Sequence, residues 1–422
     1  MKNLSQFICA FMLLALSSCS SDWNNNEPVG LDRTLIAQGS PLFELIQKVT
    51  VDGNDPMAEI VCIDFIYPFT LLIYNENLEV TGTHSLGGDD EFSAFLGALS
   101  PGQAISISYP ISTTLADGTE FIVNNNDELK IAIDSCARED LISICSGLFG
   151  GDPACVWQVP FSLNGDNSYS SGVFSANMDG TIQFHYNGQN YIGTWTFLFV
   201  NDEFQMNINL EGNSAVAQYW NFSSRVEMTE TKITIINGSS NIILQKKCEQ
   251  TETFAIGAQG SGGGIVFYDK GSYSNGWRYM EASIIDLTIS EWGCSSAATS
   301  STSSEIGKGF YNSVQVVNYH NSLANYYTNP AVCNALNDGT VISKTALLYN
   351  SKDWFLPSEQ ELLLIYQNLY SQNFGNINPA IYWSSTEVDA STVKGINFEN
   401  EQVIIIAKNP PTDISARAVR YF

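Results

Sequence analysis

Cysteine is the residue type whose spacing points most directly to chemistry in this chain. Cys19 closes the segment of residues 16–19, Leu-Ser-Ser-Cys, which matches the bacterial lipobox, where the cysteine is acylated and becomes the first residue after cleavage. Lys2 gives a basic start, and residues 7–16 form an apolar core too short to span a bilayer. We therefore expect residues 1–18 to be a lipoprotein signal peptide and Cys19 to carry the lipid. The alternative is an ordinary secretory signal with a chance cysteine.

Export decides how the remaining cysteines are interpreted. After the lipobox the chain has seven: Cys62, Cys136, Cys145, Cys155, Cys248, Cys294 and Cys333. Outside the cytoplasm such residues are candidates for disulfides rather than reduced thiols. They form no CxxC motif and no Cys/His cluster with zinc spacing, so we expect no metal site. Because seven is odd, at least one cysteine stays free or pairs with another chain.

Histidine and acidic residues give no catalytic constellation. His84, His185 and His320 lie in three different predicted domains, and no nucleophile elbow is present, so no nucleophile can be paired with an oriented base. The glycine-rich run Gly257–Gly264 is followed by neither Lys-Ser nor Lys-Thr, which argues against a phosphate-binding loop. We predict that the chain is not an enzyme, with no catalytic residues and no cofactor.

The charge balance excludes one class of partner. The chain has 422 residues and a net charge of -26, and only 15% of its residues are charged. Nucleic-acid binding is disfavoured, because phosphate contacts need clustered Lys and Arg. The acidity is uneven: residues 20–254 carry 30 acidic and 8 basic side chains, whereas residues 255–422 carry 14 and 9.

The elements that would position these residues fall into several predicted domains. Polar or glycine-rich segments separate them: a flexible tether over residues 19–32, a linker over 137–154 with a short helix and a glycine-rich break, and a linker over 249–257. The length is sufficient for two to four domains. The predicted fold class is therefore multidomain, β-rich α+β.

Residues 33–136 contain an internal repeat. Ile63–Thr70 aligns with Ile105–Ser112, and both are strand-like alternations with Tyr-Pro at the same place. Each is followed by a second extended run and by an acidic helix start, at Asp90 and Asp127. We predict two strand-strand-helix units in one small α+β domain. The helix macrodipole favours acids at these positions, so a calcium site is not needed to explain them.

Strands dominate residues 155–248. Short alternating runs, among them Gln218–Phe222, are separated by Asn-Gly and Asp-Gly turns, which is typical of an antiparallel β-barrel or sandwich. The strand that begins Gly193-Thr194-Trp195 gives the segment a lipocalin-like appearance. A barrel of about eight strands holds one small ligand or is filled by its own side chains, and we favour the filled barrel. Cys155 and Cys248 bracket the domain and would join its first and last strands.

The strongest local pattern lies in the last domain, residues 258–422. Asp353–Ser358 reads as a buried strand end closed by proline, after which Ser358 is the N-cap of a helix. Glu361 lies three residues beyond Ser358 and completes a capping box. The helix then presents one apolar face, formed by Leu362, Ile365, Tyr366 and Leu369.

Together with Tyr382–Glu387 and Ala416–Phe422, this motif resembles the C-terminal domain of the Legionella collagen-like adhesin (Lcl), a C-type-lectin-like module. The resemblance follows residues 258–422 in order and implies a lectin-like α+β fold with an internal Cys294–Cys333 bridge. These are the only cysteines of the predicted domain, and the bridge would close a 39-residue loop that contains a Ser/Thr-rich run, Ser295–Ser304, expected to be flexible.

The resemblance also bears on activity and ligand. Formylglycine-generating enzymes share the fold but need a reactive cysteine pair late in the domain, and no cysteine follows Cys333. The calcium-binding signatures of sugar-binding lectins are absent. The adhesin binds sulfated polysaccharide, but this domain is acidic, and Lys408, Arg417 and Arg420 form its only basic cluster near the end. Such modules usually bind over the strands around Trp383, which is our candidate binding residue; the alternative is that Trp383 is a core residue.

We therefore expect a lipoprotein of the bacterial cell envelope, held in the outer membrane by Cys19 and displayed at the cell surface. Its function would be non-catalytic binding or adhesion to a glycan or protein. The alternatives are a structural or assembly component of an envelope complex, and binding of a small ligand by the barrel. The expected disulfides are Cys62–Cys136, Cys155–Cys248 and Cys294–Cys333, with Cys145 free.

Overall fold

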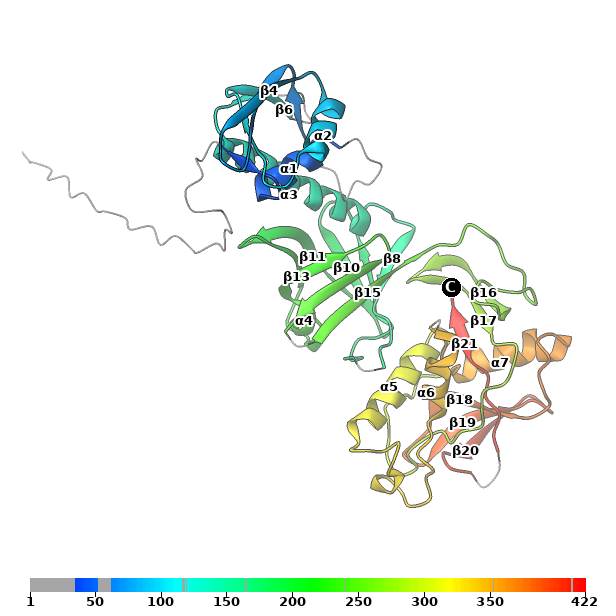
Figure 1. The fold of residues 1–422 in the computed structure, drawn as a ribbon. Helices are drawn as coiled ribbons and strands as arrows, with labels where there is room; N and C mark the ends of the chain where they lie inside the picture. The colour runs from blue at the N-terminus through cyan, green and yellow to red at the C-terminus, as the bar shows by residue number, and fades with distance from the viewer. Residues whose placement is uncertain are drawn as a thin grey trace, which may run out of the picture. The chain divides into compact units, whose positions relative to one another are not determined.

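The computed structural model describes residues 35–51, 62–115, 118, 120–163, 165–238, 240–351, 353–410 and 413–422 (Figure 1). They belong to two compact units, within residues 1–140 and 141–422. The predicted signal peptide, Cys19 and the tether lie outside the described residues. No described helix is both long and apolar enough to cross a bilayer.

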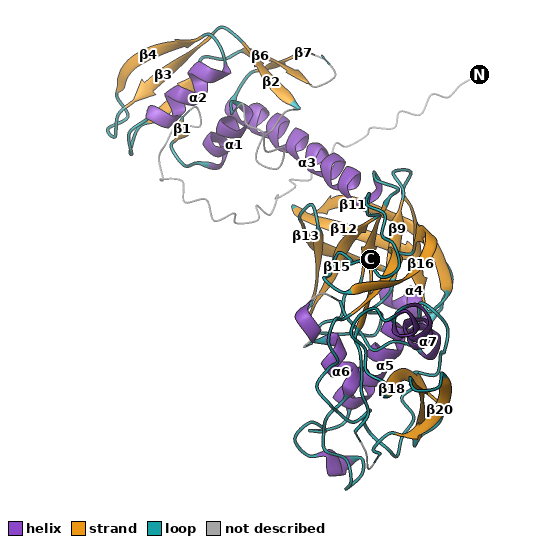
Figure 2. Ribbon diagram, turned by 90° about the vertical axis from the view of Figure 1, so that its right-hand side faces the viewer, coloured by secondary structure: helices purple, strands orange, loops and turns teal. Residues whose placement is uncertain are grey.

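The fold class is confirmed at the level of a β-rich chain with an eight-stranded antiparallel closed barrel, several further sheets and few helices (Figure 2). The barrel and the C-terminal residues form one compact unit, although the sequence pattern placed a linker between them at 249–257.

The N-terminal unit contains the predicted repeat, but each repeat has three strands rather than two. Its elements are β1 (Ile36–Ala37), α1 (Pro41–Val49), β2 (Ile63–Ile66), β3 (Phe69–Tyr74), β4 (Val80–Leu86), α2 (Asp89–Ala98), β5 (Ala104–Ile107), β6 (Ile111–Leu115) and β7 (Glu120–Val123). Each long strand expected from the sequence is interrupted at its Tyr-Pro pair, Tyr67-Pro68 or Tyr109-Pro110, and both peptide bonds are cis. The interruption arises because proline has no N–H to donate to a β-ladder.

The two repeats exchange their first strands. The sheets have the orders β1-β5-β3-β4 and β2-β6-β7, so the first strand of each repeat pairs with the hairpin of the other. Leu71 of β3 lies opposite Ile107 of β5, and Phe65 of β2 lies opposite Thr113 of β6. The exchange places apolar side chains from both repeats in one core, so neither repeat buries its apolar face alone.

The helix α3 (Asn126–Gly150) is longer than the short helical piece predicted within 137–154. Leu129 and Ile133 belong to the core of the N-terminal unit, whereas Cys145 and Phe149 belong to the barrel core. Burial of Phe149 contributes about 1.5–3 kcal/mol, which offsets the cost of about 1 kcal/mol for a helical glycine such as Gly147. The glycine-rich break predicted at residues 147–153 therefore starts inside the helix, which continues to Gly150.

The barrel closes through the strand order β10-β11-β12-β13-β14-β15-β8-β9. Its strands are β8 (Cys155–Gln158), β9 (Val173–Ala176), β10 (Thr181–Tyr186), β11 (Gln189–Val200), β12 (Glu203–Leu210), β13 (Phe222–Met228), β14 (Lys232–Asn237) and β15 (Ser240–Cys248). The strand expected over Gln218–Phe222 is wrong, because α4 (Ala215–Trp220) occupies most of it. Ser214 caps α4 by accepting a hydrogen bond from the Ala217 amide, and the helix buries Trp220.

Large side chains occupy the barrel interior. Trp157, Phe174, Phe184 and Trp220 are each no more than 1% exposed and belong to one apolar cluster. An eight-stranded barrel is just wide enough to be filled in this way. The packing agrees with the filled barrel favoured from the sequence.

The described C-terminal residues form two small sheets and three α-helices. The elements are β16 (Ile265–Ser274), β17 (Trp277–Ala282), α5 (Gly309–Ser322), η1 (Pro330–Val332), α6 (Ile342–Leu347), η2 (Tyr349–Ser351), α7 (Glu359–Asn368), η3 (Tyr370–Gln372), β18 (Ile381–Glu387), β19 (Thr392–Asn397), β20 (Gln402–Ala407) and β21 (Val419–Tyr421). Their sheet orders are β16-β17-β21 and β18-β19-β20. Figure 1 shows β21 beside β17, which brings the end of the chain next to the entry strands.

The predicted capping box at the start of α7 is present. The Ser358 hydroxyl accepts a hydrogen bond from the Glu361 amide, and the Glu361 carboxylate accepts one from the Ser358 amide at 2.8 Å. Fully buried Glu361 also accepts hydrogen bonds from the Gly307 amide at 2.8 Å and the Tyr421 hydroxyl at 2.7 Å. One carboxylate therefore fixes the start of α7, the approach to α5 and the last strand.

Candidate functional site

The described cysteines form three disulfides, Cys62–Cys136, Cys155–Cys248 and Cys294–Cys333. These are the pairs expected from the sequence. Cys155 and Cys248 lie directly opposite each other on β8 and β15. Cys145 is free and buried, and burial raises the pKa of its thiol to about 11, so the thiol stays protonated and unreactive at neutral pH.

Trp383 is not a surface residue, which corrects its place as a candidate binding residue. Its side chain is 1% exposed and belongs to a core cluster with Trp354 and Leu356. The indole N–H donates to the Ser290 carbonyl at 3.3 Å. The ring is buried in this core cluster. The alternative interpretation, that Trp383 is a core residue, is therefore correct.

The basic residues near the end of the chain each form an ion pair with an acidic side chain. Lys408 pairs with Glu387 at 2.6 Å, and Arg417 pairs with Asp286 at 2.7 Å. Lys408 and Arg417 are at most 1% exposed. Arg420, the third basic residue of the predicted cluster, pairs with Glu281 at 2.6 Å.

The Lys408–Glu387 pair holds the Ser/Thr-rich segment that the sequence indicated as flexible. Glu387 accepts hydrogen bonds from the Thr299 amide at 2.8 Å and the Ser300 amide at 3.0 Å. Lys408 donates to the Ala297 carbonyl at 2.8 Å. Both charges of the pair are therefore satisfied by the loop that they hold against the core.

The histidines have separate partners. His84 contacts Glu91 at 3.1 Å, and His185 on β10 contacts the Asn190 side chain at 2.6 Å. His320 on α5 is fully buried, with Nδ1 donating to the Val316 carbonyl and Nε2 accepting from the Cys294 amide. Burial lowers the pKa of His320 to about 4, which keeps the ring neutral in the folded chain.

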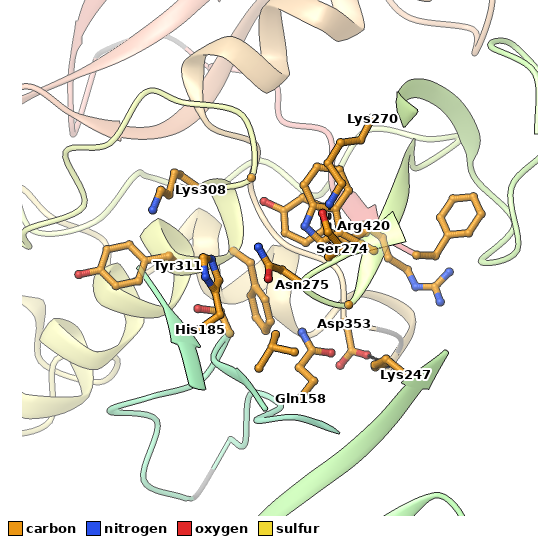
Figure 3. Close-up of a pocket in the computed structure, with 18 of the residues that line it drawn as sticks. Gln158, His185, Lys247, Lys270, Ser274, Asn275, Lys308, Tyr311, Asp353 and Arg420 are labelled. Atoms are coloured by element: carbon orange, nitrogen blue, oxygen red, sulfur yellow. Dashed lines mark hydrogen bonds and ion pairs between the residues drawn. The ribbon is translucent and has the colours of Figure 1, made fainter. Parts of the chain in front are cut away.

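A pocket of about 380 Å³ lies where the barrel meets the C-terminal elements. Barrel strands contribute Gln158 from β8, His185 from β10, and Lys246 and Lys247 from β15. The C-terminal elements contribute Lys270 from β16, Lys308 and Tyr311 at the start of α5, and Arg420 from β21. Figure 3 labels Gln158, His185 and Lys247 from the barrel, together with the four C-terminal side chains, around the same space. We call it the composite pocket.

Two of the cations at the composite pocket already have carboxylate partners. Lys247 lies 2.6 Å from Asp353, and Arg420 pairs with Glu281. The Lys247–Asp353 contact joins a barrel strand to the segment that leads into α7. It therefore helps to hold the two walls of the pocket together. These pairs contribute to the structure of the pocket.

Lys270 and Lys308 have only neutral partners among the described residues. The Lys270 amine donates to the Ser274 carbonyl at 2.8 Å and lies 3.7 Å from the centre of the Trp277 ring. The Lys308 amine donates to the Asn187 side chain at 3.2 Å. Burial lowers the pKa of Lys270 to about 8. Burial also lowers the pKa of Lys308, with Glu305 acting in the opposite direction.

Sequence reasoning missed the composite pocket because its walls lie on both sides of the predicted linker at 249–257. Lys246 and Lys270 are separated by that linker, and Lys308 is farther along the chain. One local signal was present: Lys246 and Lys247 are adjacent lysines at the end of a strongly acidic segment. No protein-family model matches this chain, and no curated protein is similar to it in sequence.

Proposed function

We propose that this chain is an exported, lipid-anchored protein of the bacterial cell envelope that binds a ligand without transforming it. In this proposal the C-terminal residues are a lectin-like domain of the Lcl type, the barrel is lipocalin-like, and Cys19 is the membrane anchor. The ligand is a glycan or a protein segment. Display at the cell surface would make the protein an adhesin.

The composite pocket is the observation that carries this proposal. Its wall combines amide and hydroxyl groups, such as Gln158, Asn275 and Tyr311, with amine groups, and these are groups that hold a polar ligand by hydrogen bonds. His185, the one described histidine at the pocket, already contacts Asn190 at 2.6 Å. These hydrogen-bonding groups support recognition of a polar ligand at the pocket.

The test is a binding screen of residues 20–422 against glycans and extracellular proteins, with and without calcium. Gln158→Trp would fill the composite pocket, and Gln205→Trp is its matched control on barrel strand β12, away from the pocket. We expect saturable binding that Gln158→Trp abolishes and Gln205→Trp preserves. Equal binding by both variants would place the ligand elsewhere and contradict the proposal.

The anchor is tested separately in cells. Cys19→Ala should move the chain from the membrane fraction to the soluble exported fraction, because one acylated cysteine is the only membrane attachment that we propose. An unchanged membrane fraction would contradict lipidation at Cys19. If the binding screen is blank with the chain folded, crosslinking in intact cells that recovers one stoichiometric partner would support an envelope-assembly component instead.

A further inference from the structure

We infer that the composite pocket is an oxyanion site, in which Lys270 and Lys308 bind the carboxylate, phosphate or sulfate group of a small polar ligand. This inference rests on the proposed binding function and adds the chemical class of the ligand. It places the ligand between the barrel and the C-terminal elements.

The charge of the pocket wall is opposite to that of the chain. The whole chain has 18 basic and 44 acidic side chains. Among the described residues, five Lys or Arg and one acidic residue, Asp353, line the pocket. A pocket that followed the average composition would carry more acids than bases. Since net charge and its local pattern decide which ions a cleft concentrates, this pocket attracts anions although the chain repels them.

The two lysines are partly removed from water, and only Lys308 has an acidic neighbour, Glu305, that partly offsets this. Their described partners are the Ser274 carbonyl and the Asn187 amide oxygen, and no carboxylate lies within ion-pair distance of either amine in the described part of the chain. Placing an ammonium group in such surroundings costs free energy, as the lowered pKa of Lys270 indicates. A bound oxyanion would remove that cost and form charge-assisted hydrogen bonds.

Two contacts hold the Lys270 amine in place at the pocket wall. The amine lies over the face of Trp277, whose ring stacks on Tyr421 with centroids 4.8 Å apart. A cation held over an indole in this way loses less conformational freedom when a ligand binds. Figure 3 shows Lys270 and Lys308 on the C-terminal wall, with Gln158 and His185 on the barrel wall.

The start of α5 is not an alternative anion site. At a free helix N-terminus, backbone amides can donate hydrogen bonds to an anion. Here the Gly307 and Gly309 amides already donate to Glu361, at 2.8 and 3.3 Å. That carboxylate is fully buried and belongs to the capping box of α7. The lysines, rather than these two amides, therefore supply positive charge at the pocket.

The test uses galacturonate, inorganic phosphate and sulfate as anionic probes and galactose as the neutral counterpart of galacturonate, by calorimetry on residues 20–422. Lys270→Gln/Lys308→Gln removes both charges, and Lys270→Arg/Lys308→Arg keeps them. Lys48→Gln/Arg225→Gln changes the net charge equally at exposed positions outside the pocket lining. Circular dichroism and thermal unfolding verify that each variant is folded.

We expect at least one anionic probe to bind saturably and galacturonate to exceed galactose by about tenfold or more. The Gln double variant should lose at least tenfold in anion affinity, whereas the Arg double variant and the exposed control should stay within about threefold of the parent chain. The relative affinities of the three anions then identify the oxyanion. Preferential binding of phosphate or sulfate supports the same site and indicates that the ligand carries that group instead of a carboxylate.

Three results would overturn the inference. They are the absence of binding by all three anions, measurable binding of galactose and galacturonate with equal affinity, or anion affinity that the Gln double variant leaves unchanged. The proposed function is judged independently, because a neutral glycan or protein that binds the parent chain and fails to bind Gln158→Trp would support it while the oxyanion inference fails.

Discussion

The buried Lys408–Glu387 pair gives the sharpest prediction about stability. Lys408→Met keeps most of the side-chain volume and removes the charge, which leaves the Glu387 carboxylate unpaired at a side-chain exposure of 1%. Removing one partner of a buried pair typically costs about 3–5 kcal/mol, mainly because the other charge stays buried alone. The Ala297 carbonyl also loses its hydrogen bond from Lys408, so the Ser/Thr-rich loop should loosen at the same time.

The matched control is Lys394→Met on β19. Lys394 also pairs with a glutamate, Glu359, but the lysine side chain is 34% exposed. Pairs open to solvent contribute about 0.2–1 kcal/mol, so the same substitution should cost about 1 kcal/mol or less. The two variants compare one chemical change in two environments.

The assay is urea unfolding of residues 20–422, supported by thermal unfolding. We expect Lys408→Met to lower the free energy of unfolding by about 3–5 kcal/mol, which corresponds to a fall in Tm of roughly 6–10 °C for a unit of this size. Adding Glu387→Gln should recover part of this loss, because the neutral amide removes the unpaired buried charge. Equal costs for Lys408→Met and Lys394→Met, or no recovery in the double variant, would refute the reasoning.

Three further predictions follow from individual groups. The pKa of His320 is about 4 in the folded chain and about 6.5 when unfolded, so its stabilising effect is complete above pH 6.5 and is lost as the pH falls to 4. The loss should be about 3 kcal/mol, and His320→Gln should lack this part of the pH dependence in urea unfolding between pH 7 and 4; the same dependence in both chains would contradict it. Replacing both Cys294 and Cys333 by serine opens a 39-residue loop and should lower the free energy of unfolding by about 4 kcal/mol in the chain-entropy model, and a change below about 1 kcal/mol would argue against this bridge as a major constraint. Because the pKa of Lys270 is about 8, affinity for an anionic probe should fall from pH 7 to pH 9 by calorimetry, whereas constant affinity to pH 9 would exclude this amine from the site.

The sequence alone predicted the elements whose signals are local. Ser358 and Glu361 are three residues apart, so the capping box and the start of α7 depend on one turn of helix. The barrel strands were indicated by alternation and turn residues, which act over a few positions. The wrong prediction, a strand where α4 lies, also concerns a local signal. The N-cap at Ser214 outweighs a short run of strand-forming residues.

Tertiary structure decided the features that need long-range register. The exchange of strands between the two repeats leaves the local pattern unchanged, so sequence reasoning grouped each repeat with itself. Only the structure revealed that Lys408 and Glu387 form a buried ion pair that binds the loop at Thr299. The composite pocket likewise exists only where β15 and β16, which the predicted linker separates, come together around Lys270. Local propensities act through neighbours in the chain, whereas buried charges and pockets depend on contacts that only the packed fold brings within a few ångströms.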